Sequence, residues 1–248
     1  LKGHRRSVNA IAVSPDGGLM VSAGNESDLF LWDPSSGKRH GTLAGHVYDV
    51  YAVAFSPDGQ WLASAGRDRT VILWDLGKRQ LAKKFEGHED SVLTLAFSPK
   101  GRWLLSGDKA GQLKRWNVGT GKESASLSSY RGQPIAAIAV SPDGQWFATA
   151  GGDNPVRLWI AEAMQLKRTM TGSPGSVNTL AFTPDSKLLL AGGTDDTLRI
   201  WDTLSGGVVH DLIGHDGDVQ AVVVSTVGST IATAGKDKTI RIWKAETR

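Results

Sequence analysis

The sequence contains no cysteine among its 248 residues, which excludes disulfide bonds, thiolate catalysis and cysteine-ligated zinc. It shows no charged-then-apolar signal pattern at its start, and no apolar run approaches the ~18 residues of a membrane span. The net charge is only +3 and both signs are interspersed, so attraction to nucleic acid or to an anionic membrane is weak. We expect no nucleic-acid partner, no membrane association and a cytoplasmic location, although a signal peptide removed on maturation would leave no trace.

Tryptophan marks an internal repeat. Six of the nine tryptophans end apolar stretches such as "VILW" and "IRIW" and stand 42 or 43 residues apart: Trp32, Trp74, Trp116, Trp159, Trp201 and Trp243. The turn sequence "SPDG" keeps the same step at 14–17, 56–59 and 141–144, and so does Gly-His at 3–4, 45–46, 87–88 and 214–215. Self-similarity at a fixed period of this length predicts an array of like structural units.

Each repeat has the pattern of four short strands. In the second repeat we predict strands at 50–56, 61–66, 71–75 and 81–87, with Pro-Asp-Gly supplying the turn after the first. Four strands cannot bury both faces of their own sheet, so neighbouring sheets must stack. Residues 1–248 are therefore predicted to form a single all-β domain of six four-stranded antiparallel sheets arranged around an axis, a β-propeller.

In these markers the chain resembles the WD-repeat family of β-propellers, over essentially its whole length. The resemblance implies that each sheet, or blade, holds a hydrogen-bonded set made of His, Ser or Thr, Asp and Trp. Rings of this family most often have seven blades. We expect six here, or seven if further residues precede Leu1.

The set is complete in the second and sixth repeats: His46, Ser64, Asp68 and Trp74, then His215, Thr233, Asp237 and Trp243. The first repeat has His4, Ser22 and Trp32, with Glu26 at the Asp position. The third has His88, Ser106 and Trp116, with Ala110 at that position. The fourth has Thr149, Asp153 and Trp159, with Arg131 replacing His, and the fifth has Asp195 and Trp201, with Ser173 and Ala191 elsewhere. We expect the fourth and fifth blades to be the least protected against hydrogen exchange.

The chemistry of the set favours a structural role. A buried indole N–H needs an acceptor, which a hydroxyl supplies, and the hydroxyl can in turn donate to His and His to Asp. Ser, His and Asp also make up a hydrolase triad, but here the set recurs and its Ser lies inside a strand rather than on an exposed elbow. No two histidines have the spacing of a metal site. We predict no catalytic residues, no metal and no cofactor.

The family resemblance implies that partners dock on the face that carries two sets of loops, one between the fourth and first strands and one between the second and third. Three residue classes point there: those three and five places after the His position, and those just before the Asp position. The predicted partner-binding residues are Asn9, Asp49, Tyr51, Arg67, Leu93, Lys109, Asn178, Asp218, Gln220 and Lys236. Among them, Tyr51 is the kind of aromatic anchor that dominates many interfaces.

With no catalytic constellation, the predicted function is a non-catalytic scaffold that presents propeller faces to partner proteins or peptides. The alternative is an enzyme, or a regulatory domain, that binds a small molecule at the mouth of the channel. That alternative requires titratable groups converging at the mouth, and the predicted ring of Asn, Tyr, Leu, Ala, Asn and Gln offers none.

Overall fold

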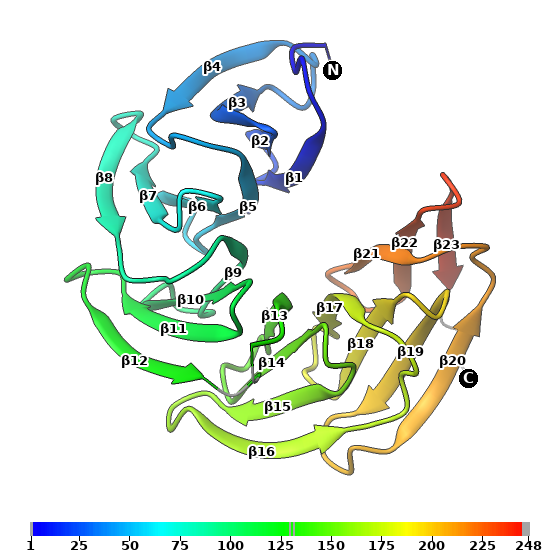
Figure 1. Cartoon of the computed structure of the whole chain (residues 1–248). Helices are drawn as coiled ribbons and strands as arrows, with labels where there is room; N and C mark the ends of the chain where they lie inside the picture. Colours follow the sequence, from blue (N-terminus) through cyan, green and yellow to red (C-terminus); the bar gives the residue numbers. More distant parts are fainter. Residues whose placement is uncertain (1, 129, 131, 245–248) are drawn as a thin grey trace. The chain divides into compact units, whose positions relative to one another are not determined.

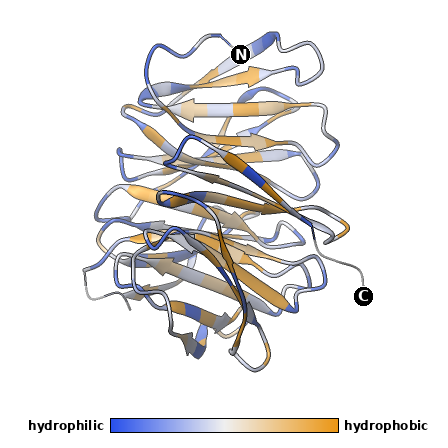
Figure 2. Cartoon of the chain, turned by 90° about the vertical axis from the view of Figure 1, so that its right-hand side faces the viewer, coloured by the Kyte–Doolittle hydropathy of each residue, from blue (hydrophilic) through white to orange (hydrophobic). Residues whose placement is uncertain are grey.

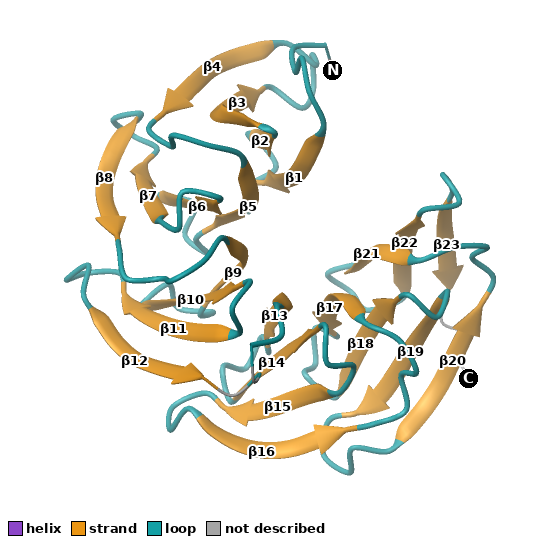
Figure 3. Cartoon of the chain, in the orientation of Figure 1, coloured by secondary structure: helices purple, strands orange, loops and turns teal. Residues whose placement is uncertain are grey.

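Short antiparallel strands joined by tight turns make up the regular structure (Figures 1 and 3). The computed structural model describes residues 2–128, 130 and 132–244, and no helix occurs in that part of the chain. The chain divides into two compact units, Leu1–Gly132 and Gln133–Arg248. Each unit contains three sheets, which we call blades 1 to 6 in chain order.

Blades 1 to 3 form the first unit. In each of them the four strands are hydrogen-bonded to their neighbours in chain order. Blade 1 contains β1 (Val8–Val13), β2 (Met20–Gly24), β3 (Glu26–Trp32) and β4 (Arg39–Ala44). Blade 2 contains β5 (Val50–Phe55), β6 (Trp61–Gly66), β7 (Val71–Asp75) and β8 (Gln80–Phe85). Blade 3 contains β9 (Val92–Phe97), β10 (Trp103–Asp108), β11 (Gln112–Asn117) and β12 (Glu123–Ser128).

Blades 4 to 6 form the second unit, with the same antiparallel order. Blade 4 contains β13 (Ile135–Val140), β14 (Trp146–Gly151), β15 (Val156–Ile160) and β16 (Gln165–Met170). Blade 5 contains β17 (Val177–Phe182), β18 (Leu188–Gly193), β19 (Thr197–Asp202) and β20 (Val208–Ile213). Blade 6 contains β21 (Val219–Val224), β22 (Thr230–Gly235) and β23 (Ile240–Lys244).

The "SPDG" motif builds the turn between the first and second strands. In blade 2 the N–H of Gly59 donates to the carbonyl of Ser56 at 2.9 Å, and Gly59 has a φ of 69°, which glycine adopts without steric cost. The carboxylate of Asp58 accepts bonds from the Ser56 hydroxyl at 2.5 Å and from the N–H of Gln60 at 3.1 Å. These local bonds specify where β5 ends and β6 begins.

Blades bury their apolar faces against one another. One core cluster joins Leu29 and Leu31 of blade 1 to Leu62, Ile72 and Trp74 of blade 2. Further clusters join blades 2 and 3, blades 4 and 5, and blades 5 and 6. Hydropathic colouring follows this arrangement, with hydrophobic residues concentrated on strands and hydrophilic ones on the connecting loops (Figure 2). The stacking of sheets at a constant chain interval is therefore present within each unit.

The predicted strands of blade 2 agree closely with the structure. The ranges 61–66 and 71–75 coincide with β6 and β7, whereas β5 ends one residue before the predicted 56 and β8 lies at Gln80–Phe85 rather than 81–87. The expectation of four strands in every blade holds for blades 1 to 5. In the described residues blade 6 has three strands, β21 to β23. Nowhere in 2–128, 130 or 132–244 is there a helix long and apolar enough to cross a membrane.

Candidate binding surface and its supporting network

Blade 2 carries the complete predicted hydrogen-bonded set. The indole N–H of Trp74 donates to Ser64 Oγ at 2.8 Å, and Ser64 Oγ lies 2.7 Å from His46 Nε2. The second ring nitrogen of His46 lies 2.8 Å from Asp68 Oδ2. A neutral imidazole with its proton on Nδ1 satisfies all three bonds, because the hydroxyl then donates to Nε2 while accepting from the indole.

Asp68 closes this network and also shapes the loop around it. Its carboxylate accepts bonds from the N–H of Val47 at 3.1 Å and from the hydroxyl of Thr70 at 2.8 Å. Burial by itself raises the pKa of Asp68, but the hydrogen bonds from His46, Thr70 and Val47 outweigh it and lower the pKa to about 2. The carboxylate is therefore ionised at neutral pH and fixes the loop that leads into β5.

Blade 3 was expected to lack a carboxylate in its network, because Ala110 stands at the Asp position, and this expectation is wrong. Asp108, which stands two residues earlier, lies 2.8 Å from His88 Nδ1, and its side chain is fully buried. Asp108 occupies the last position of β10, which is glycine in the corresponding strand of the other five blades, and its side chain reaches the histidine from there. His88 also contacts Ser106 Oγ at 2.6 Å, and Trp116 donates to the same hydroxyl at 2.7 Å. Blade 3 therefore has a full set.

Blade 6 has the second predicted complete set, and the structure assembles it. His215 lies 2.8 Å from both Asp237 Oδ2 and Thr233 Oγ1, and Trp243 donates to Thr233 at 2.9 Å. Burial raises the pKa of Asp237, but bonds from the Thr239 N–H, His215 and the Thr239 hydroxyl bring it well below its usual range. The two complete sets predicted from spacing therefore have the same geometry.

Blade 1 replaces the Asp by Glu26 and makes a looser network. His4 contacts Ser22 Oγ at 2.6 Å and Trp32 donates to Ser22 at 2.7 Å, as in the complete blades. Glu26 Oε2 lies 3.6 Å from His4 Nδ1, and the other carboxylate oxygen instead accepts the N–H of Arg5 at 2.6 Å. Within the described residues Nδ1 of His4 has no hydrogen-bond partner.

Blade 4 lacks the histidine. Trp159 donates to Thr149 Oγ1 at 2.7 Å, and Asp153 forms an ion pair with Arg157. The predicted replacement of the histidine by Arg131 falls on a residue outside the described part of the chain.

Blade 5 lacks both the histidine and the hydroxyl. The indole nitrogen of the fully buried Trp201 finds no acceptor among the residues that the structure describes, because Ala191 stands where other blades have a hydroxyl. Asp195 pairs with Arg199 at 3.2 Å, and Arg199 also reaches Ser173 Oγ at 3.4 Å.

The Ser, His and Asp side chains do not form an accessible nucleophile. Ser64 and Ser106 are both fully buried, and each hydroxyl already accepts an indole N–H while contacting a histidine. A substrate carbonyl cannot approach an oxygen buried in this way, so the geometry supports a structural role for the set. No group of three or more His, Asp or Glu that could hold a metal ion occurs in the described residues.

The network positions a loop surface at one end of each blade. In all six blades the N–H of the residue before the Asp position donates to the carbonyl of the third residue after the His position, at 2.8–3.1 Å. In blade 2 this bond joins Arg67 to Asp49. In blade 2 a Cβ at Gly66 would lie 2.1 Å from the Asp49 carbonyl oxygen, so this close approach favours glycine, although Asp108 holds the same position in blade 3. The structure thus brings two of the three predicted residue classes together within each blade.

The loop surface of blade 2 combines exposed aromatic, apolar and charged side chains. Arg67 is exposed, lies 3.8 Å from the carboxylate of Asp49, and has its guanidinium 5.7 Å from the centre of the Tyr48 ring. Tyr48 is 56% exposed and Val47 is 67% exposed, and neither is among the partner-binding residues predicted from the sequence. Tyr51, near the start of β5, is half-buried. We call Val47, Tyr48, Asp49, Tyr51 and Arg67 the blade 2 surface.

The other predicted residues in the first unit contribute less free surface. The side-chain amide of Asn9 donates to Asn25 at 2.8 Å and to the carbonyl of Val50 at 3.0 Å, so it ties blade 1 to blade 2. Leu93 is half-buried on β9, which contacts β5, and Lys109 is exposed in the loop after β10.

In the second unit, Asn178 donates to the carbonyl of Val219 at 3.2 Å, the same inter-blade bond that Asn9 makes. Lys236 Nζ lies 2.5 Å from Asp218, and Gln220 is exposed. Binding by the predicted residues of either unit stays a prediction.

With this geometry described, the repeats can be compared with known families. The family described as "WD domain, G-beta repeat" matches the chain six times, at residues 1–33, 37–75, 79–117, 121–159, 164–202 and 206–244. The chain belongs to the WD-repeat family. The predicted all-β propeller of six WD-type repeats is thereby confirmed, and this WD-repeat protein shares a fold typical of protein-interaction scaffolds.

Similarity to individual curated proteins is confined to about one repeat. The Small ribosomal subunit protein RACK1z of Oryza sativa subsp. japonica is 54% identical over 39 residues, which are 16% of this chain and 12% of that protein. The Small ribosomal subunit protein RACK1 of Glycine max is 51% identical over 39 residues, with the same two shares. The matched segment is thus a small part of these relatives.

Proposed function

We propose that this WD-repeat protein is a non-catalytic scaffold that binds partner proteins or peptides, and that the blade 2 surface is its main contact in the first unit. The observation that carries the proposal is the combination of Val47 and Tyr48, both more than half exposed, with the exposed cation of Arg67 beside them. Aromatic and arginine side chains are enriched among the residues that dominate binding energy at interfaces.

The way in which this surface is held also supports the proposal. Asp68 binds the N–H of Val47, and the N–H of Arg67 binds the carbonyl of Asp49, so the backbone of both loops is fixed before a partner arrives. A pre-ordered surface loses less conformational entropy on binding. Asp49 offsets part of the charge of Arg67, so a partner that is mainly apolar with a mild acidic preference fits best.

The resemblance to RACK1 supports the repeat and not a role in the ribosome, because it covers 12% of those proteins. The expected cytoplasmic location also remains a proposal.

An affinity pull-down read by mass spectrometry tests the proposed surface. The double variant Tyr51→Ala with Arg67→Ala removes an anchor and the cation, whereas Lys84→Ala alters an exposed residue on the outer strand β8 and is the matched control. We expect proteins captured by both the wild type and the control to be lost from the double variant. An unchanged set of captured proteins would remove the blade 2 surface as the main contact.

A further inference from the structure

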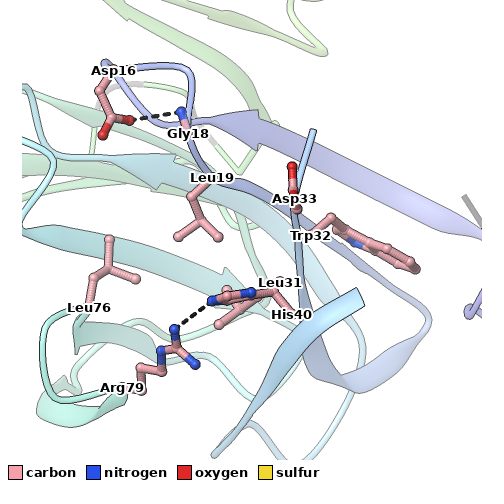
Figure 4. Close-up of a pocket in the computed structure, with 9 residues that line it drawn as sticks. All are labelled: Asp16, Gly18, Leu19, Leu31, Trp32, Asp33, His40, Leu76 and Arg79. Carbon is pink, nitrogen blue, oxygen red and sulfur yellow. Dashed lines mark hydrogen bonds between the residues drawn. The ribbon is translucent and has the colours of Figure 1, made fainter. Parts of the chain in front are cut away.

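A cavity opens between blades 1 and 2, at the strand ends opposite to the loop surface. It has a volume of about 320 Å³ and an apolar floor that includes Leu19, Leu31 and Leu76. Its polar lining comes from three turns and the start of β4: Asp16, Asp33, Arg79 and His40 (Figure 4). A neighbouring cavity of about 240 Å³ shares Asp16, Leu19 and Leu76 with it, so a bound segment would have room to continue along the junction.

Two other junctions show what occupies the corresponding place. Between blades 2 and 3, Lys83 of β8 donates from Nζ to the carbonyl of Val118 at 2.6 Å and also to that of Gly119. Between blades 4 and 5, Arg168 of β16 donates to the carbonyls of Leu204 at 2.9 Å and Ser205 at 2.5 Å. In both, a long basic side chain from the fourth strand of one blade reaches the turn between the third and fourth strands of the next.

The junction of blades 1 and 2 lacks this side chain. Lys83 and Arg168 each stand nine residues after the tryptophan of their own repeat, and the residue at that position in blade 1 is Gly41. A Cβ on Gly41 would meet Leu31 Cδ1 at an ordinary 3.5 Å, and Leu31 lines the cavity. The cavity is therefore the space that a basic side chain fills in the two equivalent junctions.

The turn between the third and fourth strands of blade 2, on the opposite wall of the cavity, also differs from the equivalent turns of blades 3 and 5. Gly121 and Gly206 have positive φ there, and a Cβ on Gly206 would lie 2.2 Å from the Cδ of Arg168. In blade 2 the same position is Arg79, with a φ of 54°, which is uncommon for a residue other than glycine. Arg79 fits because Gly41 places no side chain against it. Its Nη2 donates to His40 Nε2 at 2.6 Å, which directs the guanidinium to one side of the cavity (Figure 4).

The charge of the lining favours a cation. Hydrogen bonds from the Ser14 hydroxyl and the Gly18 N–H lower the pKa of Asp16, and the hydroxyls of Ser35 and Ser36 lower the pKa of Asp33 well below its usual range. Both carboxylates are ionised at neutral pH. The lining therefore holds two carboxylates and the single guanidinium of Arg79, which donates to His40.

We propose that the cavity between blades 1 and 2 binds an arginine or lysine side chain of a partner protein, which takes the place that Lys83 and Arg168 hold in the other junctions. The aliphatic part of that side chain packs on Leu19, Leu31 and Leu76. Its charged end donates to the turn carbonyls of blade 2, as Lys83 and Arg168 do in blades 3 and 5. This site lies away from the blade 2 surface, and its existence does not depend on that surface being used.

The variant Gly41→Arg, combined throughout with Arg79→Gly so that a glycine faces the new side chain as Gly206 faces Arg168, tests the proposal, because it supplies from within the chain the side chain that the cavity lacks. Gly41→Ala is the matched control, since it adds a Cβ and leaves the cavity open. The probes are the capped tripeptide Gly-Arg-Gly and the same peptide with citrulline, which keeps the shape of arginine without its charge. Binding is followed in ¹⁵N NMR spectra through the amides of Gly18, Asp33 and Leu76.

We expect saturable shifts at these amides with the arginine peptide in the wild type and in Gly41→Ala. Citrulline should bind about tenfold more weakly, because a charge-assisted hydrogen bond becomes a neutral one. Gly41→Arg should lose the response while keeping the spectrum of a folded protein. An absent response in the wild type, an equal response to citrulline, or an unchanged response in Gly41→Arg would each overturn the proposal. Variants of Tyr51 and Arg67 should leave these shifts unaltered, which separates this test from that of the blade 2 surface.

Discussion

Removing the carboxylate of Asp108 should destabilise blade 3 strongly, although the repeat spacing assigns no network role to this residue. Its side chain is fully buried and lies 2.8 Å from His88 Nδ1, and it accepts the N–H of Gln112 at 2.7 Å. The variant Asp108→Ala leaves both donors without their acceptor. A hydrogen bond to a charged group contributes about 1.5–3 kcal/mol, and an orphaned buried donor costs about 1–3 kcal/mol.

These contributions overlap, so we expect a loss of about 3 kcal/mol in the free energy of unfolding, near the lower end of what breaking a buried pair costs. Urea unfolding followed by tryptophan fluorescence measures the change, and hydrogen exchange at β9 and β10 shows whether it is centred on blade 3. The double variant Asp108→Ala with Ala110→Asp is the decisive control. Position 110 corresponds to Asp68 of blade 2, whose carboxylate contacts His46 Nδ1 at 2.8 Å, so the second change should supply a carboxylate from the usual position and recover much of the lost stability.

A loss below about 0.5 kcal/mol in Asp108→Ala, the range of ordinary surface substitutions, would refute this reasoning. A double variant that is as unstable as Asp108→Ala would contradict it equally.

Two further predictions follow from the other blades. Ala191→Ser should stabilise blade 5 by about 1 kcal/mol, because it supplies an acceptor for the indole N–H of Trp201; a lower urea midpoint than that of the wild type would contradict this. Asp68 has its pKa lowered from 3.8 to about 2 in the folded state, so its stabilising contribution is complete above pH ~4 and is lost as the pH falls through ~2. Urea midpoints measured across that range should therefore depend less on pH in Asp68→Asn than in the wild type.

Most of the fold could be predicted from the regular spacing of the repeats. Trp74, Ser64 and His46 recur at fixed spacing because each packs at the same place in its sheet, so strand positions and the network in blades 2 and 6 follow from the sequence. Spacing failed at Asp108, because this carboxylate comes from the last position of β10, two residues before the usual Asp position, and still contacts His88 Nδ1. An aspartate in place of the glycine that the other five repeats have at this position is the sequence signal that could have found it.

The surfaces were less predictable than the fold. Val47 and Tyr48 were not predicted as binding residues. The family resemblance names certain positions on each loop, but it does not say which neighbouring side chains are exposed. The cavity between blades 1 and 2 depends on an absent side chain at Gly41, which becomes visible only when Lys83 is seen to cross the next junction. A comparison of the repeats at the ninth residue after each tryptophan is the sequence signal that could have found it.

The central claim is that successive blades place a tryptophan at the same buried position and hold it through its indole N–H. Exchange of indole N–H protons, measured by ¹⁵N NMR, tests this most directly. The bonded indoles of Trp74 and Trp116, whose N–H groups reach a buried hydroxyl at 2.7–2.8 Å, should exchange far more slowly than those of the half-buried Trp61 and Trp103 at the starts of β6 and β10. Equal rates for the two classes would contradict the account.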